Sequence, residues 1–207
     1  MTGSFTSEQL QRLYEVSRAI HSTLESTEAL RLIVREAVSL MGASSGSLAL
    51  VNPTTGLLEI AASEGLPEDA SAMSLRPNEG ITGWVAHHGE PLRIGDVSAD
   101  ERYISARPEV RSELAVPLFI EEDVRAVLNV DAESVDAFSE TDQKLLEELA
   151  RHATQVIVNT WQYEQHRQRA ELLRSLVSVG QTINSNLHVD EVLESITREA
   201  AGLGRVK

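Results

Sequence analysis

The 207-residue sequence contains no cysteine, which excludes disulfide bonds, thiolate metal sites and thiol nucleophiles. Aromatic residues make up only 4% of it, and no apolar run approaches the roughly 20 residues that a membrane-spanning helix needs. The N-terminus also lacks the basic stretch and apolar core of a signal peptide. We therefore expect a cytoplasmic protein without a membrane partner.

Positive charge is scarce as well. Lys and Arg number 18 against 32 Asp and Glu, which gives a formal net charge of −14. Such a surface disfavours nonspecific binding to nucleic acid, because the phosphates repel it. The same charge also promotes solubility, so it identifies no partner by itself.

Two stretches of the chain resemble each other. Residues 13–40 and 176–203 align without a gap and are identical at 12 of 28 positions. A repeat at the length of a domain indicates a tandem array. We expect an N-terminal helix over residues 1–24 and a sensor domain over 25–163. A long helix is expected over 139–187, and residues 188–207 are expected to be the start of a second, truncated domain copy. An output domain is expected to lie outside this chain.

Apolar residues recur at steps of three and four over residues 10–24 and 30–41, which predicts two helices. Ser139 and Asp142 form a Ser-x-x-Asp pattern ahead of an apolar run, which is typical of a capping box at a helix start. No proline follows, so the helix from there is long. Apolar or aromatic residues recur along it at intervals of seven: Leu149, Val156, Tyr163, Ala170 and Val177.

Period-two patterns predict two hairpins, over residues 47–62 and 113–130, and a further strand over 91–94. A short helix is expected over 81–88. Pro117 donates no ladder hydrogen bond and therefore indicates an edge position or a bulge. The predicted fold is α+β: a central antiparallel sheet has terminal helices on one face, a short helix and loops over the other, and a long C-terminal stalk helix. The loop-covered face is where we expect a pocket.

Four motifs in this order resemble a GAF domain, and the resemblance runs from about Leu24 to Tyr163. They are NEGITGWVA at 78–86, GEPLRIGDV at 89–97, RSELAVPL at 111–118 and DAFSETD at 136–142. GAF domains are similar to PAS domains in architecture, and they generally bind small molecules, or dimerise, to regulate an attached output module. The resemblance implies a regulatory sensor rather than an enzyme, with a sensor histidine kinase or another two-component regulator as the analogous parent.

Specialised branches of this family can be tested against the residues. Bilin attachment and methionine sulfoxide reduction both use cysteine, which this chain lacks. Of the pattern typical of cyclic-nucleotide GAF domains, Asn129, Phe138 and Asp142 are present, whereas Val130 and Gln143 replace the expected Lys and Glu. The resemblance therefore assigns no cofactor.

A metal site is one interpretation of the acidic residues. Asp96, Asp100 and Asp131 offer the oxygen ligands that hard cations prefer. The simpler interpretation is that Asp96 and Asp100 cap turns and that Asp131 ends a strand. We favour the caps and predict no metal and no catalytic residue.

The predicted ligand pocket takes its residues from the segment over the sheet and from the strand that follows it. Each has an alternative as a core or a surface residue. The candidates for apolar walls are Trp84, Ile94, Val97, Tyr103 and Leu114, and those for polar contacts are Asp96, Arg102, Arg111 and Glu113.

These features are compatible with two functions. In the first, an unidentified small molecule binds over the sheet, reorders residues 93–110 and changes the packing of the long helix. In the second, the module binds no ligand and is a homodimeric scaffold, in which the helices over 10–24 and 149–177 form a bundle that aligns output domains.

Overall fold

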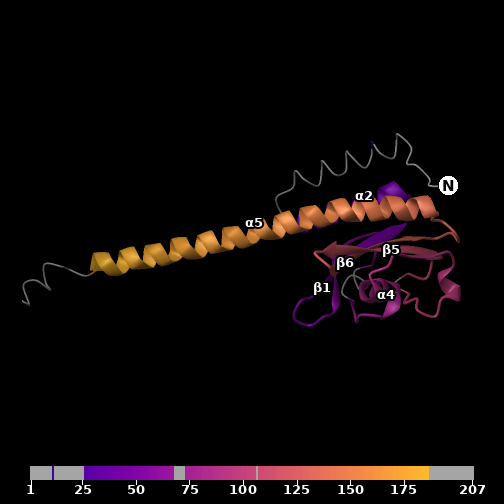
Figure 1. The fold of residues 1–207 in the computed structure, drawn as a ribbon, viewed down its shortest axis with the longest axis horizontal. Helices are drawn as coiled ribbons and strands as arrows, with labels where there is room; N and C mark the ends of the chain where they lie inside the picture. The colour runs from indigo at the N-terminus through magenta and orange to yellow at the C-terminus, as the bar shows by residue number, and fades with distance from the viewer. Residues whose placement is uncertain (1–10, 12–25, 68–72, 106, 187–207) are drawn as a thin grey trace, which may run out of the picture. The chain divides into compact units, whose positions relative to one another are not determined.

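The structure is a computed structural model that describes residue 11 and residues 26–67, 73–105 and 107–186 (Figure 1). The chain divides into two compact units, Met1–Trp161 and Gln162–Lys207, and each is described by itself. The predicted helix over 10–24, apart from Gln11, and the predicted second copy from 188 onward lie outside the described residues.

A six-stranded antiparallel sheet forms the centre of the first unit. Its strand order is β3-β2-β1-β6-β5-β4. The two predicted hairpins are confirmed as β1–β2 and β5–β6. The bounds are β1 Ser45–Val51, β2 Leu58–Glu64, β3 Ser74–Leu75, β4 Leu92–Ile94, β5 Ser112–Ile120 and β6 Asp123–Ala132. The two-residue strand β3 was not predicted, because two residues carry no periodicity.

Two helices cover one face of the sheet (Figure 1). Helix α2 spans Ser26–Met41, and α5 spans Glu140–Asn186. The apolar stripe of α2 is fully buried at Ile33 and Val34, as the spacing of three and four predicts. These side chains pack with Leu128 of β6 and with Leu149 of α5 in one continuous core. Side chains of both helices therefore fill the space over the centre of this face.

The opposite face is covered by helix α4, which spans Gly80–His88, and by the 3₁₀ turn η1, Val97–Ala99 (Figure 1). A smaller core there includes Ala49, Val85 and Val127. The prediction of a short helix and loops on this face is confirmed. Loops leave more free space over a sheet than packed helices do, and this face contains the cavity described below.

The start of α5 has the predicted capping box. The amide of Asp142 donates to Ser139 Oγ at 3.2 Å, and the amide of Ser139 donates to Asp142 Oδ2 at 2.7 Å. Pro117 lies beyond the part of β5 that pairs with β4, and a register shift follows between Leu118 and Phe119. Both features predicted for this proline are therefore present.

The second unit is described only as the distal part of α5. Four large apolar side chains of this part are exposed by about 60%: Leu172 (61%), Leu173 (62%), Leu176 (59%) and Val177 (60%). Leu149, the first residue of the seven-residue pattern, is fully buried in the core of the first unit. The predicted bundle over residues 149–177 therefore cannot include this side chain, and the rest of it stays a prediction. No helix among the described residues has the length and apolarity to cross a membrane.

Candidate functional site

A row of polar side chains crosses the middle of the sheet on the α4 face. Glu113 of β5 lies directly opposite Asp131 of β6, and Asp131 lies opposite Ser45 of β1. Two residues away on each of these strands, Asn129 of β6 lies opposite Ser47 of β1. Asn129 and Asp131 are two residues apart on one strand and so point to the same face. The sheet register thus brings together groups that are far apart in the sequence.

These polar groups are buried. Glu113 is 5% exposed and Asp131 is 6% exposed. Ser45 Oγ donates to Asp131 Oδ2 at 3.1 Å, and Ser47 Oγ donates to Asn129 Oδ1 at 2.5 Å. Asn129 Nδ2 lies 3.5 Å from Glu113 Oε1 and 3.5 Å from Asp131 Oδ1, the outer limit of a hydrogen bond. The two carboxylates therefore have weak polar partners for such deep burial.

A cavity of about 70 Å³ lies over this row. Its polar lining comes from Ser47, Thr82, Tyr103, Glu113, Asn129 and Asp131. Its apolar lining comes from Ile60, Leu66, Met73, Leu75, Ile81 and Val110. Mostly apolar walls with a few convergent polar groups are the usual composition of a small-molecule site.

Burial dominates the electrostatics of the cavity. It raises the pKa of Glu113 well above its ordinary value, and the neighbouring Asp131 raises it further. Burial raises the pKa of Asp131 to about 6, although the Ser45 hydroxyl, Arg107 and Asn129 act in the opposite direction. Burial, followed by the charges of Asp131 and Glu113, raises the pKa of Tyr103 to about 12. The tyrosine therefore remains a neutral hydroxyl at the cavity wall.

Glycines let α4 begin close to the cavity. Gly80 has a φ of 71°, in the left-handed region that favours glycine. A Cβ on Gly83 would lie 2.5 Å from the carbonyl oxygen of Arg76, so no larger side chain fits there without a backbone shift. The backbone at this helix start is therefore tight. It places Gly80, Ile81 and Thr82 against the cavity.

Two of the nine predicted site residues, Tyr103 and Glu113, line the cavity. Three others, Trp84, Ile94 and Val97, belong to the surrounding core on the α4 face. Leu114 is a correction: it is fully buried in the core beneath α2 and α5. Since successive strand residues point to opposite faces, Leu114 and Glu113 cannot both line one cavity.

The remaining predicted residues form pairs beside the cavity. Arg102 Nη2 lies 2.6 Å from Asp100 Oδ2, and the guanidinium lies over the Trp84 ring, 5.2 Å from its centroid. Arg111 Nη2 lies 3.3 Å from Asp96 Oδ2. Asp96 also accepts from the Ser98 amide at 3.1 Å and so caps η1, as predicted. The three predicted residues Asp96, Arg102 and Arg111 thus pair within the loop and do not line the cavity.

Sequence reasoning missed Asn129 and Asp131 as partners in one cavity with Glu113. One feature of the sequence could have revealed them. The two polar residues are spaced two apart within the otherwise mostly apolar strand β6, so both point to the same face of the sheet. The cyclic-nucleotide pattern includes only Asn129, and the metal interpretation includes only Asp131, so neither pattern joins the two residues.

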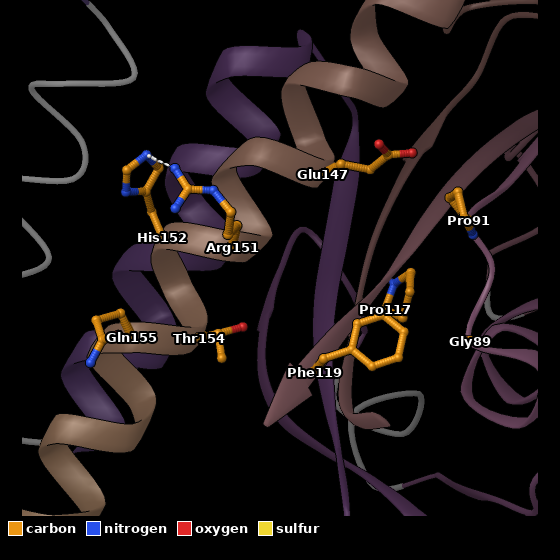
Figure 2. Close-up of a pocket in the computed structure, with 9 residues that line it drawn as sticks. All are labelled: Gly89, Pro91, Pro117, Phe119, Glu147, Arg151, His152, Thr154 and Gln155. Atoms are coloured by element: carbon orange, nitrogen blue, oxygen red, sulfur yellow. Dashed lines mark hydrogen bonds between the residues drawn. The ribbon is translucent and has the colours of Figure 1, made fainter. Parts of the chain in front are cut away.

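A larger hollow of about 670 Å³ lies between the end of β5 and α5. Figure 2 shows the ring of Phe119 beside Pro117, facing the α5 side chains across the hollow. Phe119 is 44% exposed, and the charged groups bond to neighbours on α5, such as Arg151 with Glu148 and Glu147 with Gln143. This hollow is open and its charges are paired, so the smaller cavity is the stronger candidate.

The fold is an α+β module in which two helices cover one face of an antiparallel sheet, and a short helix and loops cover the other. Residues 23–158 match the family model of the GAF domain, and the chain therefore belongs to the GAF domain family. The resemblance seen in its motifs is thereby confirmed.

Solved structures agree with this assignment. The GAF domain of an Acinetobacter phosphoenolpyruvate-protein phosphotransferase is 25% identical, with a TM-score of 0.69 over 75% of this chain and 95% of that one. A free methionine-R-sulfoxide reductase from Neisseria meningitidis, in complex with its substrate, is 22% identical with a TM-score of 0.69, over 78% and 97% of the two chains. The second likeness shows the fold alone.

Curated relatives include Nif-specific regulatory proteins. That of Azotobacter vinelandii is 28% identical over 100 residues, which are 46% of this chain and 19% of the relative. That of Azospirillum brasilense is 27% identical over 139 residues, which are 63% of this chain and 22% of the relative. The match thus spans about a fifth of these relatives.

Proposed function

We propose that this chain is a regulatory, small-molecule-sensing GAF domain of a cytoplasmic signal-transduction protein, without catalytic activity of its own. The single observation that carries the proposal is the cavity whose apolar walls surround the buried polar row of Glu113, Asn129 and Asp131. A sheet core gains nothing from two buried acids, since burying a charge costs free energy unless a partner compensates it. Perturbed ionisable groups in a cavity are typical of binding sites.

The parent protein is proposed to be a regulator in which this domain precedes further modules. The Nif-specific regulatory proteins among the relatives favour such a parent over the sensor histidine kinase suggested by analogy. The tandem repeat is part of this proposal: the stretch over residues 176–203 is proposed to open a second domain copy. We do not propose sulfoxide reductase activity, because its thiol chemistry needs a cysteine and this chain has none.

The ligand signal is proposed to pass from the cavity-side loop to α5. Arg93 on β4 donates to the carbonyl oxygen of Phe138 at 3.2 Å, just before the helix begins. Tyr103, in the same segment, lines the cavity. Occupation of the cavity thus changes the segment over 93–110, and the contact at Phe138 carries that change to the first turn of α5.

Two-dimensional amide NMR with metabolite pools tests the sensing function. We expect at least one pool to shift saturably the resonances of Ile81, Glu113 and Asn129, together with those of Ser139 and Asp142 at the start of α5. Shifts confined to Phe119 and Thr154 would place the ligand in the larger hollow and contradict the site. The absence of any saturable shift would contradict sensing itself.

A homodimeric scaffold is the second candidate, and the exposed apolar side chains of distal α5 favour it. Leu172 and Leu176 are one helical turn apart, as are Leu173 and Val177. A second copy of the helix is proposed to cover them. Sedimentation of a Leu172→Glu/Leu176→Glu variant should show a monomer where the wild type shows a dimer. A Glu171→Gln variant is the matched control, and a monomeric wild type would contradict the scaffold.

A further inference from the structure

The charge of the cavity is concentrated in two facing carboxylates. Glu113 and Asp131 are direct partners across β5 and β6, and both are more than nine-tenths buried. Like charges directly opposite each other destabilise a sheet pair, and the effect grows with burial. An arrangement of this kind is stable at neutral pH only when protons or a cation reduce its negative charge.

The cation Arg107 offsets this charge only in part, because the pKa of Asp131 stays raised despite it. Neither carboxylate lies within an ion pair among the described residues. Arg107, whose charge acts on Asp131, is bonded to Glu133 at 2.7 Å and to the carbonyl oxygen of Ser44 at 3.5 Å.

Glu113 has spare capacity to accept hydrogen bonds. Its one hydrogen bond among the described residues is the 3.5 Å contact from Asn129 to Oε1. Its second oxygen, Oε2, accepts none within that part of the chain. Because Glu113 is buried and lines the cavity, the free oxygen is available to a donor that enters it.

The remaining walls select the size and character of that donor. Ile60, Leu75 and Val110 line the cavity beside the acids, and these side chains favour alkyl groups over a hydrated ion. Among the described residues, no group of three or more acidic, His or Cys side chains is placed to hold a metal. The volume of about 70 Å³ is well below the roughly 300–1,000 Å³ that is usual for ligand pockets, so the occupant is small.

We propose that the cavity binds a small organic ammonium ion, whose N–H groups donate to the carboxylates of Glu113 and Asp131 while its alkyl part lies against Val110 and the other apolar walls. This inference rests on the proposed sensing function and adds the chemical class of the ligand. The amide nitrogen of Asn129 already lies 3.5 Å from one oxygen of each carboxylate, so a single donor between the two acids can reach both. Charge-assisted bonds of this kind are about twice as strong as neutral ones.

The protonation of the two acids supports the assignment. Burial raises the pKa of both acids, that of Asp131 to about 6, so Asp131 retains a proton below about pH 6. The other ionisable groups that act on the pair are Asp100, Tyr103 and Arg107. An ammonium ion that enters replaces the retained proton, so binding should release protons to the buffer and tighten as the pH rises through about 6.

The test is a titration of the whole chain with primary alkylammonium chlorides from methyl to hexyl, followed by amide NMR and by calorimetry in buffers of different ionisation enthalpy. The matched neutral probes are the corresponding alcohols. We expect one chain length to shift Glu113 and Asp131 saturably, to bind at least about tenfold more tightly than its alcohol, and to release protons. Glu113→Gln and Asp131→Asn should each weaken binding by about tenfold or more.

Glu122→Gln, an exposed acid in the turn between β5 and β6, is the control and should leave binding unchanged. Equal loss in the control and the cavity variants would indicate surface attraction and would overturn the inference. If metabolite pools shift the cavity resonances while no alkylammonium ion does, the inference fails and the sensing function stands. If neither does, both fail. Circular dichroism of each variant separates loss of binding from loss of fold.

Discussion

The main-chain amide of Asp136 donates a 2.8 Å hydrogen bond to the carbonyl oxygen of Gly95, which ties the loop after β4 to the turn before α5. A Cβ at Gly95 would overlap the Oδ1 atom of Asp136, so a larger residue fits there only if that side chain moves. Together with the bond from Arg93 to Phe138, it joins the cavity-side segment to the start of the helix. The proposed relay depends on these two contacts.

Gly95→Ala should therefore loosen the turn before α5. Loss of the hydrogen bond, worth about 1 kcal/mol, predicts roughly fivefold faster hydrogen exchange at the Asp136 amide. Arg93→Met should raise exchange at the first amides of α5 without affecting Asp136. Glu122→Ala in the distant turn is the control. Unchanged exchange at Asp136 in the Gly95→Ala variant would show that the aspartate side chain simply rotates away.

A matched pair of glycines separates backbone strain from steric overlap. Gly65 and Gly56 share a φ of +72°, but a Cβ on Gly65 would lie 2.6 Å from the carbonyl oxygen of Ser44, whereas Gly56 has open space. Both alanine variants incur the strain of the left-handed region, about 1 kcal/mol. We expect Gly65→Ala to reduce the free energy of unfolding by at least about 1 kcal/mol more than Gly56→Ala does, because overlap with backbone must be relieved by a shift. Urea denaturation measures both, and equal losses would contradict the overlap.

The buried acids predict an unusual dependence of stability on pH. The pKa of Asp131 is raised to about 6 in the folded state from an ordinary 3.8. Between these values the folded protein holds a proton that the unfolded chain has released. The free energy of unfolding therefore falls as the pH rises through this window and stays low above it. The difference amounts to about 3 kcal/mol at most.

Asp131→Asn should remove this fall in the free energy of unfolding at higher pH, because the amide carries no charge. Its oxygen can still accept the hydrogen bond from Ser45. We expect the variant to be about 1–3 kcal/mol more stable than the wild type at pH values above 6, and about equal to it near pH 4. Urea denaturation across this range is the measurement, with Asp123→Asn at an exposed site as the control. A variant that is less stable than the wild type at neutral pH would assign Asp131 a structural role.

Much of the fold could be predicted from the sequence because its signals are local. The stripe that buries Ile33 and Val34 and the alternation around Leu128 each lie within one element. The capping pair of Ser139 and Asp142 lies within four residues. By contrast, the strand β3 exists only because β2 offers an edge to pair with, and no local pattern encodes it.

The site was less predictable because it depends on register. Glu113 and Asp131 meet only when β5 and β6 pair as they do, and one step of slippage would bury Leu114 in the cavity instead. The sequence motif at 111–118 identified the strand, but it did not show which face of the strand lies against the cavity. Tyr103 and Glu113 were predicted individually, and their relation to Asn129 and Asp131 required the sheet.

Reciprocal hydrogen bonds fix the start of α5. Ser139 and Asp142 satisfy each other's amides, and Asp142 Oδ2 also accepts from Ser139 Oγ at 2.7 Å. Ser139→Ala should cost about 1 kcal/mol of stability, as the loss of an N-cap usually does. Asp142→Ala should cost a similar amount, since it also removes a negative charge from the helix N-terminus.

A double-mutant cycle tells a shared capping box from two independent contacts. If the bonds are reciprocal, the double variant should lose less than the sum of the two single variants, with a coupling of at least about 0.5 kcal/mol. Ser98→Ala, which removes a hydroxyl bonded to Asp96 at the surface, is the control for loss of a serine hydroxyl alone. Strict additivity would mean that each side chain acts on its own, and would weaken the case that the start of α5 is a fixed point from which a signal can travel along the helix.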